Sequence, residues 1–82
     1  MLIQRFYVRR IEMAWHRVIK ITPKDNFYFH FTIESYENLG LISTIEKKDG
    51  ILTLDCFTTM ESSRDFDRVI ESVLREIKKS HE

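Results

Sequence analysis

The chain of 82 residues contains one cysteine, one proline and two glycines. A single cysteine, Cys56, excludes an internal disulfide and any zinc site built from several cysteines. No apolar run approaches the ~20 residues that a membrane-spanning helix requires, and the N-terminus lacks the apolar core of a signal peptide. We therefore expect a soluble, cytoplasmic protein without a membrane partner.

The sequence also lacks the motifs that usually carry enzyme chemistry. It contains no Gly-rich phosphate loop, no nucleophile elbow and no paired-carboxylate signature. His16, His30 and His81 are too widely spaced to match a metal-ligand pattern. Cys56 has no local cation that would activate its thiol, which favours a buried structural cysteine. We therefore predict no catalytic residue, no metal site and no cofactor.

The composition suits one small domain spanning residues 1–82. Its hydrophobic content of 43% is ordinary for a globular protein, so intrinsic disorder is not expected. The net charge is zero, but residues 1–24 hold six basic residues and one acidic residue, whereas residues 25–82 hold seven basic and twelve acidic residues. This asymmetry suits either a basic binding face or two halves that pack side by side, and we favour the second.

Two patterns compete in residues 22–40. Apolar residues alternate with more polar ones over residues 27–34, which is typical of a half-buried strand. In contrast, the sequence TPKD at residues 22–25 is typical of a helix start, and NLG at residues 38–40 suits a left-handed helix stop. We favour a helix over residues 23–37, because a strand leaves both caps unexplained. The residues that then share one stripe of the helix are Phe27, Phe31, Glu34 and Asn38.

Residues 11–21 show strand periodicity. Their odd positions are apolar except for Arg17, and their even positions are mostly polar or small. In the preceding segment the apolar even positions are Leu2, Phe6 and Val8, whereas Arg5 and Arg9 interrupt the odd ones. This change of phase implies a turn or bulge near residues 9–10 if both segments are strands. A helical pattern also fits this region, so residues 1–10 remain open between strand, helix and disorder.

After Gly40 the sequence predicts a hairpin. Residues 41–46 and 51–57 alternate as two strands, and the KKDG sequence of residues 47–50 supplies the turn between them. Gly50 suits the positive φ that such a turn requires.

The last predicted element is an amphipathic helix. Ser62 or Ser63 would cap it, with Asp65 in its first turn. Its apolar residues recur at three- and four-residue spacing and form one stripe. They are Phe66, Val69, Ile70, Val73, Leu74 and Ile77. Lys78 and Lys79 suit the C-terminal end of the helix, and we expect the final residues to fray.

The predicted order is (β)–β–α–β–β–α, an α+β fold with residues 11–79 as its core and residues 1–10 as an N-terminal extension. A β-α-β-β-α chain lacks only the last strand of a ferredoxin-like fold, in which two helices cover one face of the sheet. That strand lies antiparallel beside the strand that precedes the first helix. Residues 2–8 could fill its place as a hairpin, and a strand from another protomer could fill it instead.

From about Trp15 to Ile77 the chain resembles a family of short bacterial proteins catalogued as domain of unknown function 4911. The similar features are a strand ending in ITPKD (residues 21–25), the E-x-Y motif in IESYE (residues 33–37), a Leu-Gly pair, a Lys-Asp-Gly turn and a terminal amphipathic helix. The chain departs from the family in Asn38, near where a glycine is common, and in its basic, aromatic N-terminal extension. The resemblance implies the fold and a bacterial context but no activity.

Four residues in and after the E-x-Y motif are candidates for ligand or partner contacts, namely Glu34, Tyr36, Asn38 and Thr44. A carboxylate beside a phenol could act as an acid–base pair. Residues two apart on a helix point in different directions, however, so Glu34 and Tyr36 do not converge on one proton. We favour structural roles for both, and a small enzyme using Glu34 and Tyr36 is the second alternative.

The N-terminal sequence RFYVRR, residues 5–10, raises the question of nucleic-acid binding. Arg5, Tyr7 and Arg9 share a face if the segment is a strand, and Arg10 adds a further candidate contact. Aromatic and basic side chains on a sheet bind single-stranded RNA by stacking and phosphate contacts. The RNA-recognition signature is absent, so a single-stranded nucleic-acid-binding module is the alternative function and not the leading one.

We predict a non-enzymatic module that self-associates as a homodimer or larger homo-oligomer, through its N-terminal segment or the open face of its sheet. Such a module suits a small-ligand sensor or an accessory subunit. The reasons are the missing fourth strand, the apolar N-terminal extension and the lack of a catalytic constellation.

Overall fold

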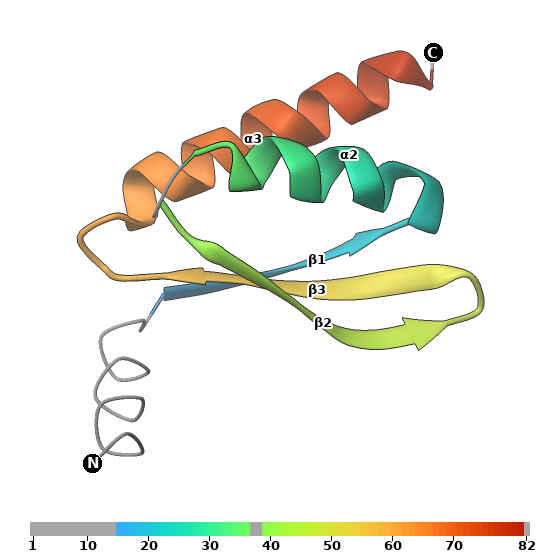
Figure 1. The fold of residues 1–82 in the computed structure, drawn as a ribbon, viewed down its shortest axis with the longest axis horizontal. Helices are drawn as coiled ribbons and strands as arrows, with labels where there is room; N and C mark the ends of the chain where they lie inside the picture. Colours follow the sequence, from blue (N-terminus) through green and yellow to red (C-terminus); the bar gives the residue numbers. More distant parts are fainter. Residues whose placement is uncertain (1–14, 37–38, 82) are drawn as a thin grey trace.

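A computed structural model describes residues 15–36 and 39–81 of the chain. The three strands form one antiparallel sheet, and both helices lie on the same face of it (Figure 1). The elements are β1 (Trp15–Ile21), α2 (Pro23–Glu34), β2 (Leu41–Lys48), β3 (Ile51–Thr58) and α3 (Ser63–Ser80). This α+β architecture confirms the predicted β-α-β-β-α order. The predictions for residues 1–14 lie outside the described residues.

The sheet has the strand order β1-β3-β2. β3 lies in the middle and is antiparallel to both neighbours, so β1 and β2 run parallel to each other with α2 in the connection between them. This order of three strands differs from the four-stranded order of a ferredoxin-like sheet, and no strand of the described residues lies beyond β1. The prediction is therefore confirmed for the α+β class and for two helices on one face of the sheet, and not for the ferredoxin-like order.

The alternation in β1 directs its odd-numbered residues toward the helices. Ile19 and Ile21 are buried there, whereas Val18 on the other side of the strand is 57% exposed. Trp15 packs edge-on against Phe66 of α3, with ring centroids 6.1 Å apart. The strand periodicity of the sequence is thus confirmed over β1.

The start of α2 is the predicted one. The backbone N–H of Asp25 donates to the hydroxyl of Thr22 at 3.4 Å, and Pro23 lies in the first turn. These groups suit a helix start, since the cap satisfies an unpaired amide and proline has no N–H to satisfy. The helical interpretation of this segment is confirmed over the strand interpretation.

The predicted end of α2 is wrong. The helix ends at Glu34, and Ser35 keeps a right-handed conformation in which its hydroxyl donates to the Thr32 carbonyl at 2.6 Å. Of the residues expected to allow a left-handed stop, Gly40 has no positive φ, and Asn38 lies outside the described residues. A Cβ on Gly40 would overlap the ring of Phe66 instead, so a glycine is needed there because the chain passes close to α3.

β2 and β3 form the predicted hairpin with a tighter turn than expected. The turn consists of Asp49 and Gly50, whose φ values of 53° and 75° are those of a two-residue type I′ turn. β2 consequently extends through Lys48, two residues past its predicted end. Its register shifts between Thr44 and Glu46, which marks a bulge or irregularity in the strand.

The start and end of α3 differ in detail from the prediction. Ser62 occupies the N-cap position, but its hydroxyl makes no capping bond, and its backbone N–H donates to the hydroxyl of Thr59 at 3.1 Å. The helix extends to Ser80, one residue past the predicted end of the core at Lys79. None of the described helices is long and apolar enough to cross a membrane.

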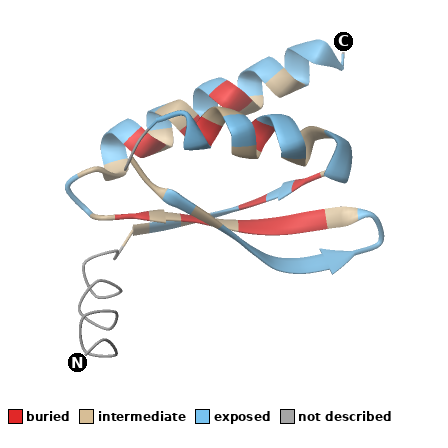
Figure 2. Cartoon of the chain, viewed as in Figure 1, coloured by how far each residue is buried: buried red, intermediate tan, exposed pale blue. Residues whose placement is uncertain are grey.

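The hydrophobic core lies between the sheet and the two helices. Figure 2 shows buried residues along β3 and on the sides of both helices that face the sheet. The predicted stripe of α3 contributes three fully or nearly fully buried residues, and its other members pack against the rim of the core. The buried apolar residues are Ile19, Ile21, Phe29, Ile33, Leu52, Leu54, Cys56, Phe66, Ile70 and Val73.

Candidate functional site

The candidate residues predicted from the E-x-Y motif lie on different elements. Glu34 is exposed at the last position of α2, and Tyr36 follows it with 48% of its surface exposed. Thr44 is exposed in β2, where it pairs across the strands with Leu54. No side-chain hydrogen bond among the described residues involves any of these three candidates. The candidates that lie outside the described residues are Arg5, Tyr7, Arg9, Arg10 and Asn38.

A polar cluster that the sequence analysis missed links β1 to α3. Arg17 interrupts the apolar odd positions of β1, so its side chain leaves the strand on the side of the helices. Its guanidinium donates to Asp67 at 2.6 Å and to Glu71 at 2.8 Å. These two carboxylates lie one helical turn apart and face the same way. The sequence does contain an indication of this cluster, namely an arginine at an otherwise apolar position of the strand. A charge on the buried face of a strand requires a partner of opposite charge on the helices that cover that face.

The electrostatics of this cluster indicate a structural role. Burial lowers the pKa of Arg17, but the hydrogen bonds and charges of Glu71 and Asp67 outweigh this effect, so the net shift of the pKa is upward. The guanidinium is therefore charged and already occupied by two carboxylates. The cluster holds α3 on the sheet and leaves Arg17 unsuited to binding a free anion.

A second polar pair lies on the sheet face that the helices leave uncovered. Nδ1 of His16 donates to the carboxylate of Asp55, with distances of 3.0 and 3.1 Å to its two oxygens. The His16 ring also stacks on Phe57, its cross-strand neighbour, with centroids 5.6 Å apart. Both contacts fix the imidazole within the sheet, so it does not project freely toward a ligand.

The same sheet face carries a shallow hollow near the hairpin turn. Its volume is about 330 Å³, and it is lined by Lys20, Glu46, Lys48, Asp49, Ile51 and Thr53. The lining combines basic and acidic side chains in equal number. Phosphate binding requires a clear excess of positive charge, so this hollow does not extend the predicted basic surface.

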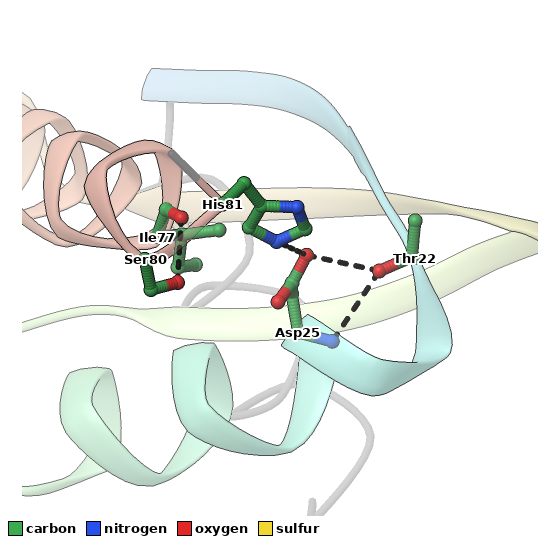
Figure 3. A network of polar contacts seen from close by, with 5 residues as sticks. All are labelled: Thr22, Asp25, Ile77, Ser80 and His81. Carbon is green, nitrogen blue, oxygen red and sulfur yellow. Dashed lines mark hydrogen bonds and ion pairs between the residues drawn. The ribbon is translucent and has the colours of Figure 1, made fainter.

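A third network joins the two helices (Figure 3). The carboxylate of Asp25 accepts hydrogen bonds from Nε2 of His81 at 2.9 Å and from the hydroxyl of Thr22 at 3.0 Å. The hydrogen bond from His81 is the largest influence on the pKa of Asp25 and lowers it. Desolvation, the next largest, raises the pKa, and the hydrogen bond from Thr22 lowers it again, so the net shift is downward. Asp25 thus lies in the first turn of α2 and also ties the end of α3 to it.

A hollow of about 300 Å³ lies beside this network. It is lined by Asp25, Tyr28, Glu76, Ile77 and Ser80. The Ser80 hydroxyl donates back to the Ile77 carbonyl at 2.8 Å, and Asp25 is already engaged by two donors. Two of the polar groups that line the hollow are therefore already engaged within the chain, and the other two polar side chains are those of Tyr28 and Glu76.

Cys56 is buried in β3, as the sequence predicts. Burial raises the pKa of its thiol to about 12, and the charge of Asp55 acts in the same direction. The thiol is therefore protonated at neutral pH and is not a nucleophile. Over residues 15–36 and 39–81, no group of three or more His, Cys, Asp or Glu side chains gathers as metal ligands would.

The outer face of α2 is the most apolar part of the described surface of the helices. Phe27 and Phe31 expose 78% and 69% of their surface, and Tyr28 beside them is also exposed. The two phenylalanines lie on the predicted stripe with Glu34, but their spacing alone does not determine which way that stripe faces. Phe29 is buried on the opposite side of the helix, so the stripe faces solvent.

A comparison with family models matches residues 19–79 to the domain of unknown function DUF4911. The chain belongs to this family. The DUF4911 match confirms the resemblance found in the sequence and includes all three strands and both helices, wholly or in part. No curated protein and no solved structure matches the chain. The DUF4911 description names no activity, so function has to be argued from the structure.

Proposed function

We propose that this protein is a non-enzymatic module that self-associates through its N-terminal segment and the outer edge of β1. The observation that carries the proposal is the position of β1 at the edge of the sheet. β1 pairs with β3 along its whole length on one side, and on its other side no described strand pairs with it. An unpaired strand edge presents a row of N–H and C=O groups that bind another strand.

This edge is where a ferredoxin-like sheet carries its fourth strand. Residues 2–8 precede β1 and carry Leu2, Phe6 and Val8 on even positions, so we propose that they take that place. The segment between residues 2 and 21 contains no Gly, Asn, Asp or Pro, which disfavours a tight turn back onto its own β1. Pairing with a second copy needs no such turn, and it joins two sheets into a homodimer by strand addition.

The polar side chains support binding over catalysis. Arg17, His16 and Asp25 each contact partners within the chain, and the Cys56 thiol is buried and protonated. An active site requires such groups to converge on a space that a substrate can enter. One hollow has a lining of balanced charge, and in the other Asp25 and Ser80 are already engaged within the chain, so an accessory subunit fits the geometry better than a small-ligand sensor.

The test is the mass of the full chain in solution, measured by size exclusion with light scattering. We expect a dimer or larger species, and we expect deletion of residues 1–10 to reduce it. A chain in which residues 1–10 are replaced by a Gly/Ser sequence of equal length is the control for chain length. An oligomer that both variants leave unchanged would rule out a role for the N-terminal strand.

The same experiment tests the nucleic-acid alternative, which uses Arg5, Tyr7, Arg9 and Arg10. Absorbance is recorded at the nucleic-acid and protein wavelengths together. Nucleic acid that co-elutes at low salt and is lost at high salt would favour that alternative, because phosphate contacts depend on salt concentration.

A further inference from the structure

α2 is apolar on two opposite faces. Its inner face contributes Phe29 and Ile33 to the core, where they are 0% and 1% exposed. Its outer face carries Phe27 and Phe31, one helical turn apart and mostly exposed. A helix at the surface of a single domain normally carries polar residues on that side. Two adjacent exposed phenylalanines therefore indicate a surface that a partner covers.

The charged residues that flank the two phenylalanines make the stripe symmetrical. Lys24 lies three residues before Phe27, Phe31 lies four residues after Phe27, and Glu34 lies three residues after Phe31. This three-four-three spacing places all four on one side of the helix and is the spacing of a coiled-coil seam. The stripe has the same spacing in both directions, and its two ends carry opposite charges.

We propose that the outer face of α2 is an interface with a second copy of this chain, in which two α2 helices pack antiparallel across a two-fold axis. Phe27 then contacts the partner's Phe31. Lys24 likewise pairs with the partner's Glu34, and the axis repeats both contacts. A two-fold interface requires a surface that is complementary to itself, as this stripe is. The proposal adds a second surface to the self-association proposed above and does not depend on the N-terminal segment.

The exposed rings supply the apolar centre of a small interface. At their observed exposures, Phe27 and Phe31 together offer about 300 Å² per copy, or about 600 Å² per dimer. Tyr28 and the stems of Lys24 and Glu34 surround them and bring the contact toward the ~1,000 Å² of the smallest specific interfaces. We therefore expect a weak dimer that forms as the protein concentration rises.

A second copy fits this stripe better than a membrane surface does. Interfacial helices that bind membranes carry several Lys or Arg residues on their polar face. In α2 the one Lys or Arg residue is Lys24, and Glu34 at the other end would be repelled by anionic lipid. An unrelated protein partner does not require mirrored spacing or opposite charges at the two ends, whereas self-pairing requires both.

The test is the dimer dissociation constant of the full chain, measured by sedimentation equilibrium. Lys24→Glu alone or Glu34→Lys alone places like charges at both ends of the interface and should weaken the dimer roughly three- to tenfold. The double variant with both changes should restore it. Phe27→Ser combined with Phe31→Ser should weaken it at least about 100-fold, because four rings leave the interface. Lys79→Glu, an exposed change of equal charge on α3, is the control.

The outcomes separate this interface from the one proposed at β1. Weakening by the single charge variants with recovery in the double variant supports the α2 pairing. An unchanged dissociation constant in the double-serine variant overturns it. Binding of the full chain to anionic vesicles is measured alongside, and a double-serine variant that loses this binding while its self-association is unchanged also overturns the proposal. If deletion of residues 1–10 abolishes association and the double-serine variant does not, the β1 edge is the interface and α2 is not. The reverse result supports α2 and rejects the β1 edge.

Discussion

The two helices cover the same face of the sheet but differ in how many of their own faces are apolar. α3 buries Phe66, Ile70 and Val73 on one side, and its exposed positions are mostly polar or charged. α2 buries Phe29 on one side and exposes Phe27 and Phe31 on the other. The apolar face of α3 is therefore buried in the core of the domain, whereas α2 has a second apolar face that the domain does not bury.

This difference explains why α2 also has the pattern of a strand. A step of two residues turns an α-helix by about 200°, so apolar residues at every second position fall alternately on opposite sides. Phe27 and Phe31 thus point outward while Phe29 and Ile33 point inward. A period-2 pattern that follows a helix N-cap indicates a helix with two apolar faces. In a small domain, the second face is a candidate interface.

The largest predicted effect is the loss of folding when a charge replaces a buried residue of α3, the helix with one apolar face. Ile70→Asp should prevent folding, because it places a carboxylate without a partner at a fully buried position, and the cost approaches the ~5–15 kcal/mol that stabilises a typical domain. Phe31→Asp on the outer face of α2 is the matched change and should leave the fold intact. Far-UV circular dichroism and thermal melting measure both. An unchanged melting temperature for Ile70→Asp would remove α3 from the core.

The next effect compares the two faces of α2 directly. Phe29→Ala should lower the free energy of unfolding by about 3–5 kcal/mol, since it leaves a cavity in the core, whereas Phe27→Ala should change it by less than about 0.5 kcal/mol. Urea unfolding at low protein concentration is the measurement, because dimerisation adds to apparent stability as concentration rises. Equal losses in the two variants would contradict the two-faced description of α2.

The elements that the sequence predicted correctly depend on local patterns. The single stripe of α3, the positive φ of Gly50 and the cap formed by Thr22 follow from spacing and residue type over a few positions. The end of α2 did not follow, because Gly40 has the features of a helix stop but its role depends on Phe66, which is distant in sequence. A local rule cannot include such a contact.

The polar contacts show the same limit. An arginine at position 17 implies a carboxylate on the facing layer, yet the choice of Asp67 and Glu71 depends on the rotation of α3 over the sheet. The bond from His81 to Asp25 depends on where the two helices end relative to each other. The E-x-Y motif identified the family correctly, but Glu34 and Tyr36 marked no cluster of polar groups in the described structure.

A substitution at Gly40 tests how closely Phe66 of α3 packs against the chain at this position. Gly40→Ala should lower the free energy of unfolding by about 1–3 kcal/mol, because the added Cβ overlaps the ring of Phe66, which is fully buried and has little room to move. Gly50→Asn is the control, since asparagine tolerates the positive φ of the turn and the position is open. Equal stability of Gly40→Ala and the unmodified chain, measured by urea unfolding, would show that α3 is packed less tightly than the structure indicates.

The smallest effect concerns the contact between the two helices, and it depends on pH. The pKa of Asp25 is lowered from its ordinary 3.8, chiefly by the hydrogen bond from His81, so the folded chain binds this proton less tightly than the unfolded chain does. The ionised carboxylate therefore contributes stability that is complete above the ordinary pKa and is lost as the pH falls through the lower, folded value.

The variant Asp25→Asn tests this contribution. Its side chain keeps an oxygen that can cap α2 but does not titrate, so the other carboxylates of the protein affect both chains alike. The difference in melting temperature between the two chains should shrink as the pH falls below the ordinary pKa. A difference that stays constant through that acid range would mean that Asp25 gains nothing from His81, and that the ends of α2 and α3 are held together by packing alone.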